Sequence, residues 1–318
     1  MKKIILTIIL TLMLLGINNT ISVYAQDTTT VNEEGIKIDE TNFPNRFLRE
    51  KIQETIDKNH DNVLQEKEIN EVTVFSLSLE SYYEENPDTK ENYYILDCKG
   101  LEYFKNLKIL YLDVCRHEYD SDQRGYVNFN SIYQLKKLEK LTLVGDNLVE
   151  KWYFNKLPGL KELKLEGIVK VKKMKFGKNL EKITLYSVTS EKKLDLSSVK
   201  KLKKFSARGI NFSKVKFGKN KHLKAIDIWA AQGGKIKTIK AIDVSGLKNL
   251  KYLRISDCTK LKSVKFGKNK KLVEVSIDAK RLKSINLKGC RVSKQISLTK
   301  GTKIKNLWKG YKGVINYY

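Results

Sequence analysis

The stretch from Leu250 to Lys271, LKYLRISDCTKLKSVKFGKNKK, decides the fold. Its apolar residues lie at offsets 0, 3, 5, 8, 11, 14 and 16 from the first; they are Leu250, Leu253, Ile255, Cys258, Leu261, Val264 and Phe266. Neither an α-helix of period 3.6 nor a single strand of period 2 produces this series. Two short strands joined by turns do produce it, with Leu-x-Ile in the first strand and Val-x-Phe in the second.

The same pattern recurs along the chain. It reappears from Leu160 and, one residue shorter, from Leu202, and the segment KFGKN closes three of these units, at Lys175, Lys216 and Lys265. Starting at Leu107, the intervals between successive units are 31, 22, 20, 22, 21, 27 and 22 residues, and the two long intervals indicate insertions. Self-similarity of this period predicts a solenoid, in which each repeat buries its apolar edge against its neighbours.

The N-terminus predicts export. The chain opens MKKIILTIILTLMLLGI and reaches Val23-Tyr24-Ala25, which is typical of a signal peptide over residues 1–25. The alternative is a retained membrane anchor, for which the apolar run is short. Residues 26–35 are expected to be a flexible linker. The sequence shows no later apolar span and no sorting tail, so we expect a secreted protein, or one held non-covalently at the cell surface.

Charge divides the chain into two unlike halves. Residues 26–150 hold 26 acidic and 15 basic residues, a net charge of −11, whereas residues 151–318 hold 10 and 45, a net charge of +35. This asymmetry predicts that the second half attracts polyanions. The alternative is that the lysines only solvate the outer surface of the solenoid.

All four cysteines follow an apolar-x-apolar strand, at Cys98, Cys115, Cys258 and Cys290. This position points into the stack of repeats, so we expect buried, unpaired thiols that act as small apolar side chains. Cys98 and Cys115 are the one pair near enough in sequence to form a disulfide.

Residues 36–76 are expected to form a helical cap. Asn45 can begin a helix, and Phe47, Leu48, Ile52 and Ile56 share one face of it. The segment DKNHDNVLQEKE then has the spacing of a twelve-residue calcium loop, with ligands at Asp57, Asn59, Asp61, Val63, Gln65 and Glu68. Position 6 is Asn62, where Gly is usual. Two alternatives remain open: a structural calcium site, or a cap that keeps the loop shape without an ion.

The repeated LxxLxL motif resembles that of leucine-rich repeat proteins. FPNRFLREKI, DKNHDNVLQEKEI and the following LEYFKNLKILYL resemble the EF-hand-like cap and first repeat of internalin-like surface proteins of Gram-positive bacteria. The resemblance implies an α/β fold: a leucine-rich repeat solenoid over residues 77–300, a curved parallel sheet on its concave face, and the small cap before it. Residues 301–318 are expected to close the far end. The chain departs from the common pattern by rarely using Asn at offset 8.

The concave face is expected to carry the binding site. Residues at offsets 2, 4 and 6 of each LxxLxL strand point outward, and this set holds six acidic and six basic residues. It includes a predicted aromatic–arginine patch of residue types that dominate binding hot spots: Tyr186, Arg208, Trp229, Tyr252 and Arg254. The alternative is a face of ordinary exposed strand residues without a partner.

The sequence therefore indicates a binding protein. We expect a protein or glycan partner, on a host or bacterial surface, at the concave face, while the basic convex face retains the protein on an anionic polymer such as teichoic acid or glycosaminoglycan. One alternative is a structural protein that binds cell-wall polymer without a specific partner; a secreted hydrolase is the other. The sequence has no nucleophile elbow, HExxH motif or phosphate-binding loop, so we expect no enzyme activity and no specific nucleic-acid partner.

Overall fold

The computed structural model of the chain describes residues 35–78, 95–113, 126–145, 151–168, 171–190 and 192–318. They lie in one unit, Gly35–Tyr318. The predicted signal peptide and all of the predicted linker except Gly35 lie outside the described residues. Cys115 and His117 also lie outside them.

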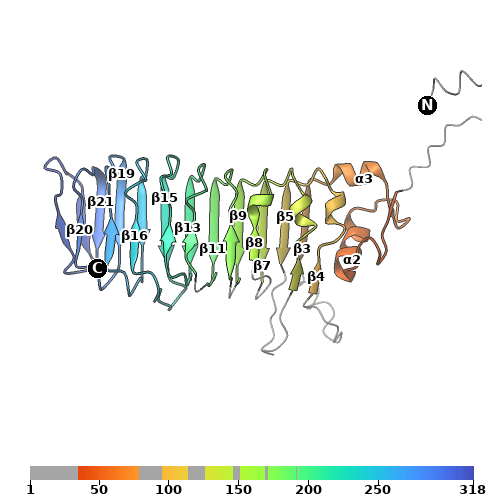
Figure 1. Cartoon of the computed structure of the whole chain (residues 1–318), viewed down its shortest axis with the longest axis horizontal. Coiled ribbons are helices and arrows are strands. Elements are labelled where there is room, and N and C mark those ends of the chain that lie inside the picture. Colours follow the sequence, from red (N-terminus) through yellow and green to blue (C-terminus); the bar gives the residue numbers. More distant parts are fainter. Residues whose placement is uncertain (1–34, 79–94, 114–125, 146–150, 169–170, 191) are drawn as a thin grey trace, which may run out of the picture. The chain divides into compact units, whose positions relative to one another are not determined.

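A parallel sheet of eleven strands runs the length of this unit, and we call it the front sheet (Figure 1). Each strand pairs in parallel with the strand of the next repeat, as the LxxLxL pattern predicts. For example, Leu163 and Leu165 lie opposite Ile183 and Leu185. Its strands are β3 (Val74–Ser78), β5 (Ile109–Asp113), β7 (Lys140–Val144), β9 (Glu162–Glu166), β11 (Lys182–Tyr186), β13 (Lys204–Arg208), β15 (Ala225–Trp229), β17 (Tyr252–Ile255), β19 (Leu272–Ile277), β21 (Val292–Leu298) and β23 (Val314–Tyr317).

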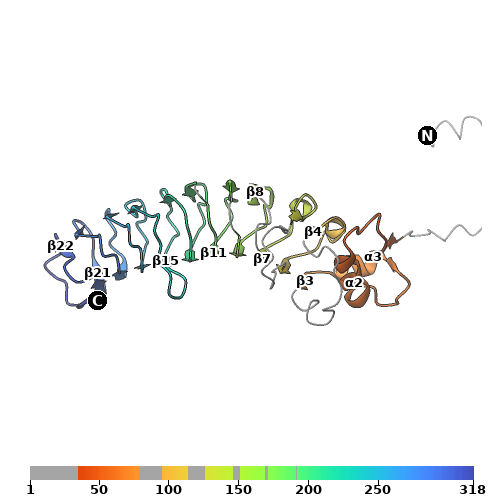
Figure 2. The ribbon, with the colours of Figure 1, turned by 90° about the horizontal axis from the view of Figure 1, so that it is seen from below.

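Shorter strands form the opposite side of each repeat, and we call them the back strands (Figure 2). They pair in four separate groups: β4 with β6; β8 with β10; β12, β14, β16 and β18 in that order; and β20 with β22. They are β4 (Ile95–Asp97), β6 (Tyr126–Asn128), β8 (Lys151–Tyr153), β10 (Lys173–Lys175), β12 (Leu194–Asp195), β14 (Val215–Lys216), β16 (Ala241–Asp243), β18 (Ser263–Lys265), β20 (Ser284–Asn286) and β22 (Lys303–Lys305). Three one-turn 3-10 helices follow early back strands, at Leu101–Tyr103, Ile132–Gln134 and Phe154–Lys156.

The leucine-rich repeat solenoid is thus confirmed, and its core lies between the front sheet and the back strands. In the defining stretch, Leu250, Leu253 and Ile255 are at most 1% exposed. Cys258 and Leu261 are buried in the turn, and Val264 is buried in the back strand. Complete burial of one such side chain contributes about 1.5–3 kcal/mol, so the stack is stabilised chiefly by apolar contacts between successive repeats.

The KFGKN segments follow three back strands, and their asparagines tie each repeat to the one before. The side-chain amide of Asn179 donates to the Pro158 carbonyl at 2.9 Å. Asn220, 2% exposed, donates to the Val199 carbonyl at 2.6 Å. Asn269, fully buried, donates to the Val244 and Leu247 carbonyls at 3.1 and 2.8 Å. These bonds add a donor to backbone carbonyls of the preceding repeat. The Val244 and Leu247 carbonyls also accept from the Leu247 and Leu250 N–H groups.

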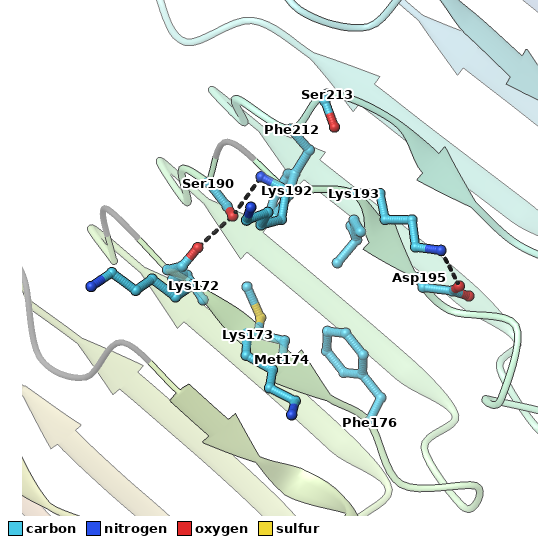
Figure 3. A pocket seen from close by; sticks show the side chains of 12 residues that line it. Lys172, Lys173, Met174, Phe176, Ser190, Lys192, Lys193, Asp195, Phe212 and Ser213 are labelled. Carbon is cyan, nitrogen blue, oxygen red and sulfur yellow. Dashed lines mark hydrogen bonds and ion pairs between the residues drawn. The ribbon is translucent and has the colours of Figure 1, made fainter.

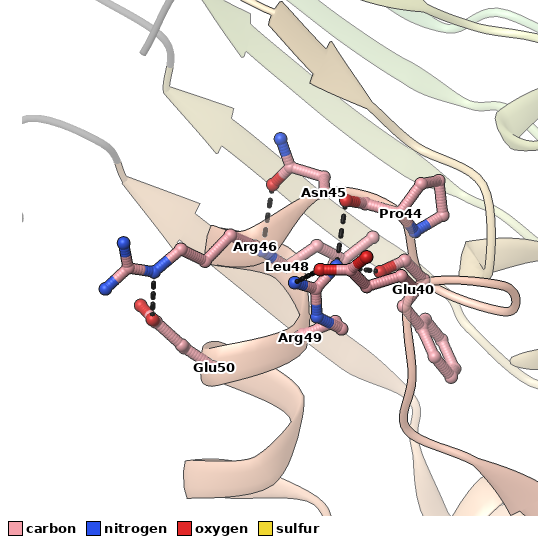
Figure 4. Close-up of polar contacts among 8 residues, drawn as sticks. Glu40, Pro44, Asn45, Arg46, Leu48, Arg49 and Glu50 are labelled. Atoms are coloured by element: carbon pink, nitrogen blue, oxygen red, sulfur yellow. Dashed lines mark hydrogen bonds and ion pairs between the residues drawn. The ribbon is translucent and has the colours of Figure 1, made fainter. Parts of the chain in front are cut away.

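The cap covers the first repeat with two helices, α2 (Arg46–Thr55) and α3 (Glu66–Glu71), and a short antiparallel pair, β1 (Ile36–Lys37) with β2 (Val63–Leu64). The predicted helix start is confirmed, because the Asn45 side chain accepts a hydrogen bond from the Leu48 N–H at 3.0 Å (Figure 4). Arg49 donates to the Phe43 and Pro44 carbonyls, each at 2.8 Å. All four residues of the predicted apolar face are buried; they are Phe47, Leu48, Ile52 and Ile56.

Residues 301–318, which were predicted to close the far end, also extend the solenoid. They form a further repeat, in which β22 pairs with β20 and β23 pairs with β21. Leu307 and Tyr311 pack against the core, as expected of closing residues. All four residues of β23 are exposed.

Among the described residues, no helix is both long enough and apolar enough to span a membrane.

Candidate binding surfaces

Three of the five predicted patch residues lie side by side on the front sheet. In the parallel register, Tyr186 of β11 is opposite Arg208 of β13, and Arg208 is opposite Trp229 of β15. The Arg208 guanidinium carbon lies 5.0 Å from the centroid of the Tyr186 ring, a cation–π distance. We call these three residues the Tyr186–Trp229 row.

Trp229 is the most exposed part of this row, at 46% of its surface. With Arg208 it lines an open hollow of about 470 Å³, whose other walls are Asp257 and the insertion residues Ala230–Lys235. This segment is the insertion indicated by the interval of 27 residues after Leu223. It forms one side of the surface that carries the exposed indole. An aromatic ring held by a strand loses little conformational freedom when it binds a partner, which favours its use as an anchor.

Tyr252 and Arg254 lie outside this row, so a single contiguous patch of all five residues stays a prediction. Arg254 lies opposite Asp227, two residues before Trp229 on the neighbouring strand. Tyr252 lies opposite Ala225, four residues before Trp229 on the neighbouring strand. Four residues of extended chain span about 13 Å. The cause is register: Trp229 occupies offset 6 in its repeat, whereas Tyr252 and Arg254 occupy offsets 2 and 4.

Arg254 is held within the protein by acidic neighbours. It donates two hydrogen bonds of 2.7 Å to the Glu274 carboxylate and lies 3.8 Å from the Asp227 carboxylate. Hydrogen bonding to Glu274, opposed by burial and aided by the acidic charges, raises the pKa of Arg254. Its guanidinium is therefore less available to a partner than that of Arg208.

Three front-sheet residues at outward offsets are nevertheless nearly buried. Asp113, Val144 and Asp227 are only 5%, 7% and 7% exposed. Asp113 accepts a hydrogen bond from the Tyr111 hydroxyl at 2.9 Å. The Asp227 carboxylate lies 3.8 Å from the Arg254 guanidinium on the next strand. Neighbouring side chains on the same face can therefore bury an outward residue, and a period-2 pattern does not contain that information.

Opposite charges pair with one another across the front sheet. Glu162 lies 4.0 Å from the Lys140 ammonium and 3.5 Å from that of Lys182, one on each neighbouring strand. Within β9, Lys164 and Glu166 lie 2.8 Å apart. Part of the balance of six acidic and six basic residues is thus realised as local ion pairs.

The predicted calcium loop has the backbone of such a loop at its sixth position. Asn62 has φ of +62°, the left-handed conformation for which Gly is usual there and which Asn tolerates. Asp57 is 2% exposed, and its Oδ1 atom is buried without a hydrogen-bond partner. A cation in the loop would satisfy this oxygen.

The other acidic ligands of the loop face backbone and amide donors. Glu68 accepts hydrogen bonds from the Lys58 and Gln65 N–H groups at 2.7 and 3.0 Å. Asp61 accepts from the Val63 N–H and from the Asn59 and Gln65 side-chain amides, at 2.8, 2.9 and 2.8 Å. Asn59, Gln65 and Glu68 would have to turn their oxygens inward to bind calcium. In the described part of the chain, no group of three or more His, Cys, Asp or Glu side chains is arranged to hold a metal ion.

Cys98, Cys258 and Cys290 are free thiols in the core, at most 2% exposed, which confirms the prediction for these three. Burial raises the pKa of all three, and that of Cys258 to about 12. The alternative, a pairing of Cys98 with Cys115, involves a residue outside the described ranges.

The back strands carry an alternating row of charges that sequence reasoning missed. Asp195, Lys216, Asp243 and Lys265 lie opposite one another on successive strands from β12 to β18. The Lys216 ammonium is 3.7 Å from Asp195, and that of Lys265 is 3.8 Å from Asp243. A two-repeat period, in which KFG alternates with DLS and DVS, was the signal that predicts this row.

Comparison with known proteins gives a distant likeness only. No family model matches the chain, and no curated protein matches it. Among solved structures, an internalin from Listeria monocytogenes is similar over 91% of this chain and 99% of that chain, with 15% sequence identity and a TM-score of 0.34. Because this TM-score is low, the assignment of the fold depends on the strand pairing described above.

Proposed function

We propose that the protein binds a protein or glycan partner on a host or bacterial surface through the concave face of its front sheet. The single observation that carries this proposal is Trp229, an indole 46% exposed on a rigid strand, next to Arg208 and an open hollow of about 470 Å³. In this proposal, the Tyr186–Trp229 row is the anchor. Tyr252 and Arg254 form a secondary contact.

The surroundings of the row fit this role. The neighbouring strands hold ion pairs that are already satisfied within the protein, such as Arg254 with Glu274. Paired charges add specificity more than affinity, because a partner must replace an existing contact. The indole and the Arg208 guanidinium are therefore expected to supply most of the binding free energy.

Capture and affinity measurements test this proposal. The mature chain would be used to capture partners from host and bacterial surface extracts at low and high salt, and the affinity of each identified partner would be measured with purified components. Trp229→Ala and Arg208→Ala should each weaken binding by about tenfold or more. Trp308→Ala is the matched control, since Trp308 is 37% exposed and lies outside the row.

Unchanged affinity in Trp229→Ala, with an unchanged melting curve, would contradict the proposal. A loss of affinity in Trp308→Ala equal to that in Trp229→Ala would contradict it too, because the effect would then not belong to the row.

The proposal has two further parts. The protein is exported by residues 1–25, and the basic second half retains it on anionic surface polymers. The structural observation that favours retention is the number of exposed lysines on and after the back strands, among them Lys175, Lys216, Lys265 and Lys268. Retention without a specific partner is the second candidate function; in that case the Trp229 variant would behave as the wild type while high salt would release the protein.

Calcium in the cap is proposed as a structural ion only. Asp57, Asn59, Asp61, Val63, Gln65 and Glu68 would be its ligands, and its chemical contribution would be charge neutralisation in the loop. The support for it is the buried, unpartnered Oδ1 atom of Asp57. No enzymatic step is part of the proposed function.

A further inference from the structure

The hollow beside Trp229 brings an exposed aromatic ring and a guanidinium together. In the parallel register, Trp229 lies opposite Arg208, and both side chains line the hollow of about 470 Å³. Neighbouring strands of a sheet are about 4.8 Å apart, so the two side chains start from adjacent points of the front sheet. One small ligand can therefore contact both.

The Arg208 guanidinium is held by a ring and keeps its hydrogen-bond donors. Its central carbon lies 5.0 Å from the centroid of the Tyr186 ring. Within the described part of the chain, its N–H groups donate no hydrogen bond and lie within ion-pair distance of no carboxylate. Contact with a ring face uses none of these donors, and a planar guanidinium binds a carboxylate through two of them. Arg254, which donates to both oxygens of Glu274, shows this two-point contact already made within the protein.

The insertion that follows Trp229 gives the hollow a wall with a fixed backbone. The Gly234 N–H donates to the Ala231 carbonyl at 2.8 Å and closes a turn. The end of the insertion is joined to the next repeat, where the Ile236 N–H donates to the Asp257 carbonyl at 2.9 Å. The ring, the guanidinium and the wall are thus all attached to the front sheet or to the turns beside it.

The remaining polar groups of the hollow include acceptors for hydroxyl groups. The exposed Asp257 carboxylate can accept hydrogen bonds, and the exposed Gln232 amide can both donate and accept. Asp257 forms no ion pair with any described residue. A second anionic group on the ligand would be repelled by this carboxylate. The lining therefore suits a ligand with one anionic group, several hydroxyl groups and an apolar face.

A sugar ring fits this lining better than a peptide segment does. β15 is paired on both sides, with β13 and β17, so an extended peptide cannot be added to it as a further strand. None of the lining residues is buried, so the hollow offers no apolar pocket for a peptide side chain. A pyranose has an apolar face for the indole and a polar edge for the surrounding donors and acceptors.

The hollow on the back of the solenoid lacks this combination (Figure 3). It has a volume of about 530 Å³ and lies between β10 and β12. Its two aromatic residues, Phe176 and Phe212, are only 4% and 2% exposed. Its carboxylate, Asp195, is 3.6 Å from the Lys193 ammonium. It therefore presents no exposed ring on which a sugar could lie.

We propose that the hollow beside Trp229 binds a pyranose ring that carries one carboxylate, as a uronic acid or a sialic acid does. The apolar face of the ring lies on the Trp229 indole, the carboxylate accepts two hydrogen bonds from Arg208, and hydroxyl groups donate to Asp257. This inference rests on the proposed function and names the chemistry of its partner.

Titration of the mature chain with small sugars, followed by ligand NMR and calorimetry, tests the inference. Methyl glucuronide and methyl sialoside have both the ring and the carboxylate. Methyl glucoside has the ring without the charge, and gluconate has the charge without the ring. At least one acidic sugar should bind in the millimolar range, and both controls should bind it about tenfold more weakly or worse, because each lacks one of the two contacts. The tighter of the two acidic sugars distinguishes a uronic acid from a sialic acid.

Variants of the two contact residues assign the contacts. Trp229→Ala and Arg208→Gln should each weaken binding of the acidic sugar by about tenfold. Arg208→Lys keeps the charge but not the two-point contact, and should weaken it by about threefold or more. Arg208→Gln should also remove the preference for the acidic over the neutral sugar, which a structural defect alone would not do. The matched controls are Arg291→Gln and Trp308→Ala, because the Arg291 guanidinium lies 5.8 Å from the Trp308 ring, outside the hollow.

Absence of saturable binding by both acidic sugars would overturn the inference. The proposed function would still stand if Trp229→Ala reduced the capture of a partner from surface extracts. Equal affinity of the wild type for methyl glucuronide, methyl sialoside and methyl glucoside would overturn the role of Arg208. So would a loss in Arg291→Gln as large as that in Arg208→Gln. A partner captured through Trp229 that kept its affinity after enzymatic removal of its acidic sugars would show that the hollow contacts a peptide surface, and the inference would be wrong.

Discussion

Arg254 and Glu274 join two strands of the front sheet through a pair of hydrogen bonds, both 2.7 Å long. The carboxylate lies on β19 and the guanidinium on β17. Such two-point contacts are geometrically specific and stronger than a single exposed ion pair. The contact explains why Arg254, although exposed on the concave face, belongs to the scaffold as much as to a binding surface.

Glu274→Gln should lower the free energy of unfolding by about 1 kcal/mol at neutral pH. Hydrogen bonding from Arg254, opposed by burial and aided by its charge, lowers the pKa of Glu274. A lowered carboxyl pKa stabilises the fold above the unfolded-state value, and this contribution is lost as the pH falls through the folded-state value. The difference between wild type and variant should therefore shrink below about pH 4. Denaturant melts across pH measure it, and a difference that stays constant with pH would contradict the assignment.

Asn269→Ala should destabilise the protein by about 2–3 kcal/mol. The fully buried amide donates to the Val244 and Leu247 carbonyls and accepts from the Gly267 N–H. Its loss removes this acceptor from the Gly267 N–H and one of two donors from each carbonyl, since these carbonyls also accept from the Leu247 and Leu250 N–H groups. Asn249→Ala is the control, because the half-exposed Asn249 donates a hydrogen bond of 2.7 Å to the Lys221 carbonyl. Equal losses in the two variants, measured by chemical denaturation, would show that burial is not the cause.

Gly267→Ala should be more destabilising than Gly177→Ala, although both glycines occupy the same position of a KFGKN segment. A Cβ atom on Gly267 would lie 2.3 Å from the Ser245 carbonyl oxygen, whereas the nearest atom to a Cβ on Gly177 would be 3.3 Å away. We expect a loss of about 2 kcal/mol or more for Gly267→Ala and about 1 kcal/mol or less for Gly177→Ala. Thermal melts of the two variants make the comparison, and the reverse order would contradict the described packing of these turns.

Calcium should raise the melting temperature of the protein if the cap binds it. An ion that binds only the folded state stabilises it by about 2.7 kcal/mol at a hundredfold excess over its dissociation constant. Asp57→Asn should abolish the calcium effect, while Glu54→Gln, on the exposed surface of α2, should leave it unchanged. An absence of any effect of millimolar calcium on the wild type would favour the cap without an ion.

The native thiols should resist alkylation. With the pKa of Cys258 raised to about 12 by burial, and those of Cys98 and Cys290 also raised, almost no thiolate is present at neutral pH. In a Cys115→Ser background, iodoacetamide should label these three residues only after denaturation. Rapid labelling of the folded protein would indicate that the turns after the strands open to solvent.

The repeat spacing was sufficient to predict the fold, and local pattern was not sufficient to predict its surfaces. Leu250, Leu253 and Ile255 were placed correctly, because burial against both neighbouring repeats imposes the same offsets in every unit. Asp227 has an outward offset and is nevertheless buried, and its carboxylate lies 3.8 Å from the Arg254 guanidinium on the next strand.

The candidate surfaces required the register between repeats. Trp229 and Tyr252 both have outward offsets in successive repeats. They occupy different offsets, however, and therefore lie in different rows of the front sheet. A hollow lined by Lys172 and Lys193, among other residues, lies where the back strands β10 and β12 do not pair with each other. Both strands have ordinary sequences, so nothing in either one indicates that their ladder is interrupted.

The continuous front sheet and the divided back strands give the two sides of the solenoid different mechanical properties. Front strands are joined by an unbroken ladder and keep a spacing of about 4.8 Å, whereas the back strands have gaps in their ladders that can widen or narrow at little cost in hydrogen bonds. Bending of the solenoid would therefore change the spacing of the back strands more than that of the front strands. A partner that docks on the front strands would meet an array of fixed pitch, while bending would change the widths of the three gaps between the four groups of back strands.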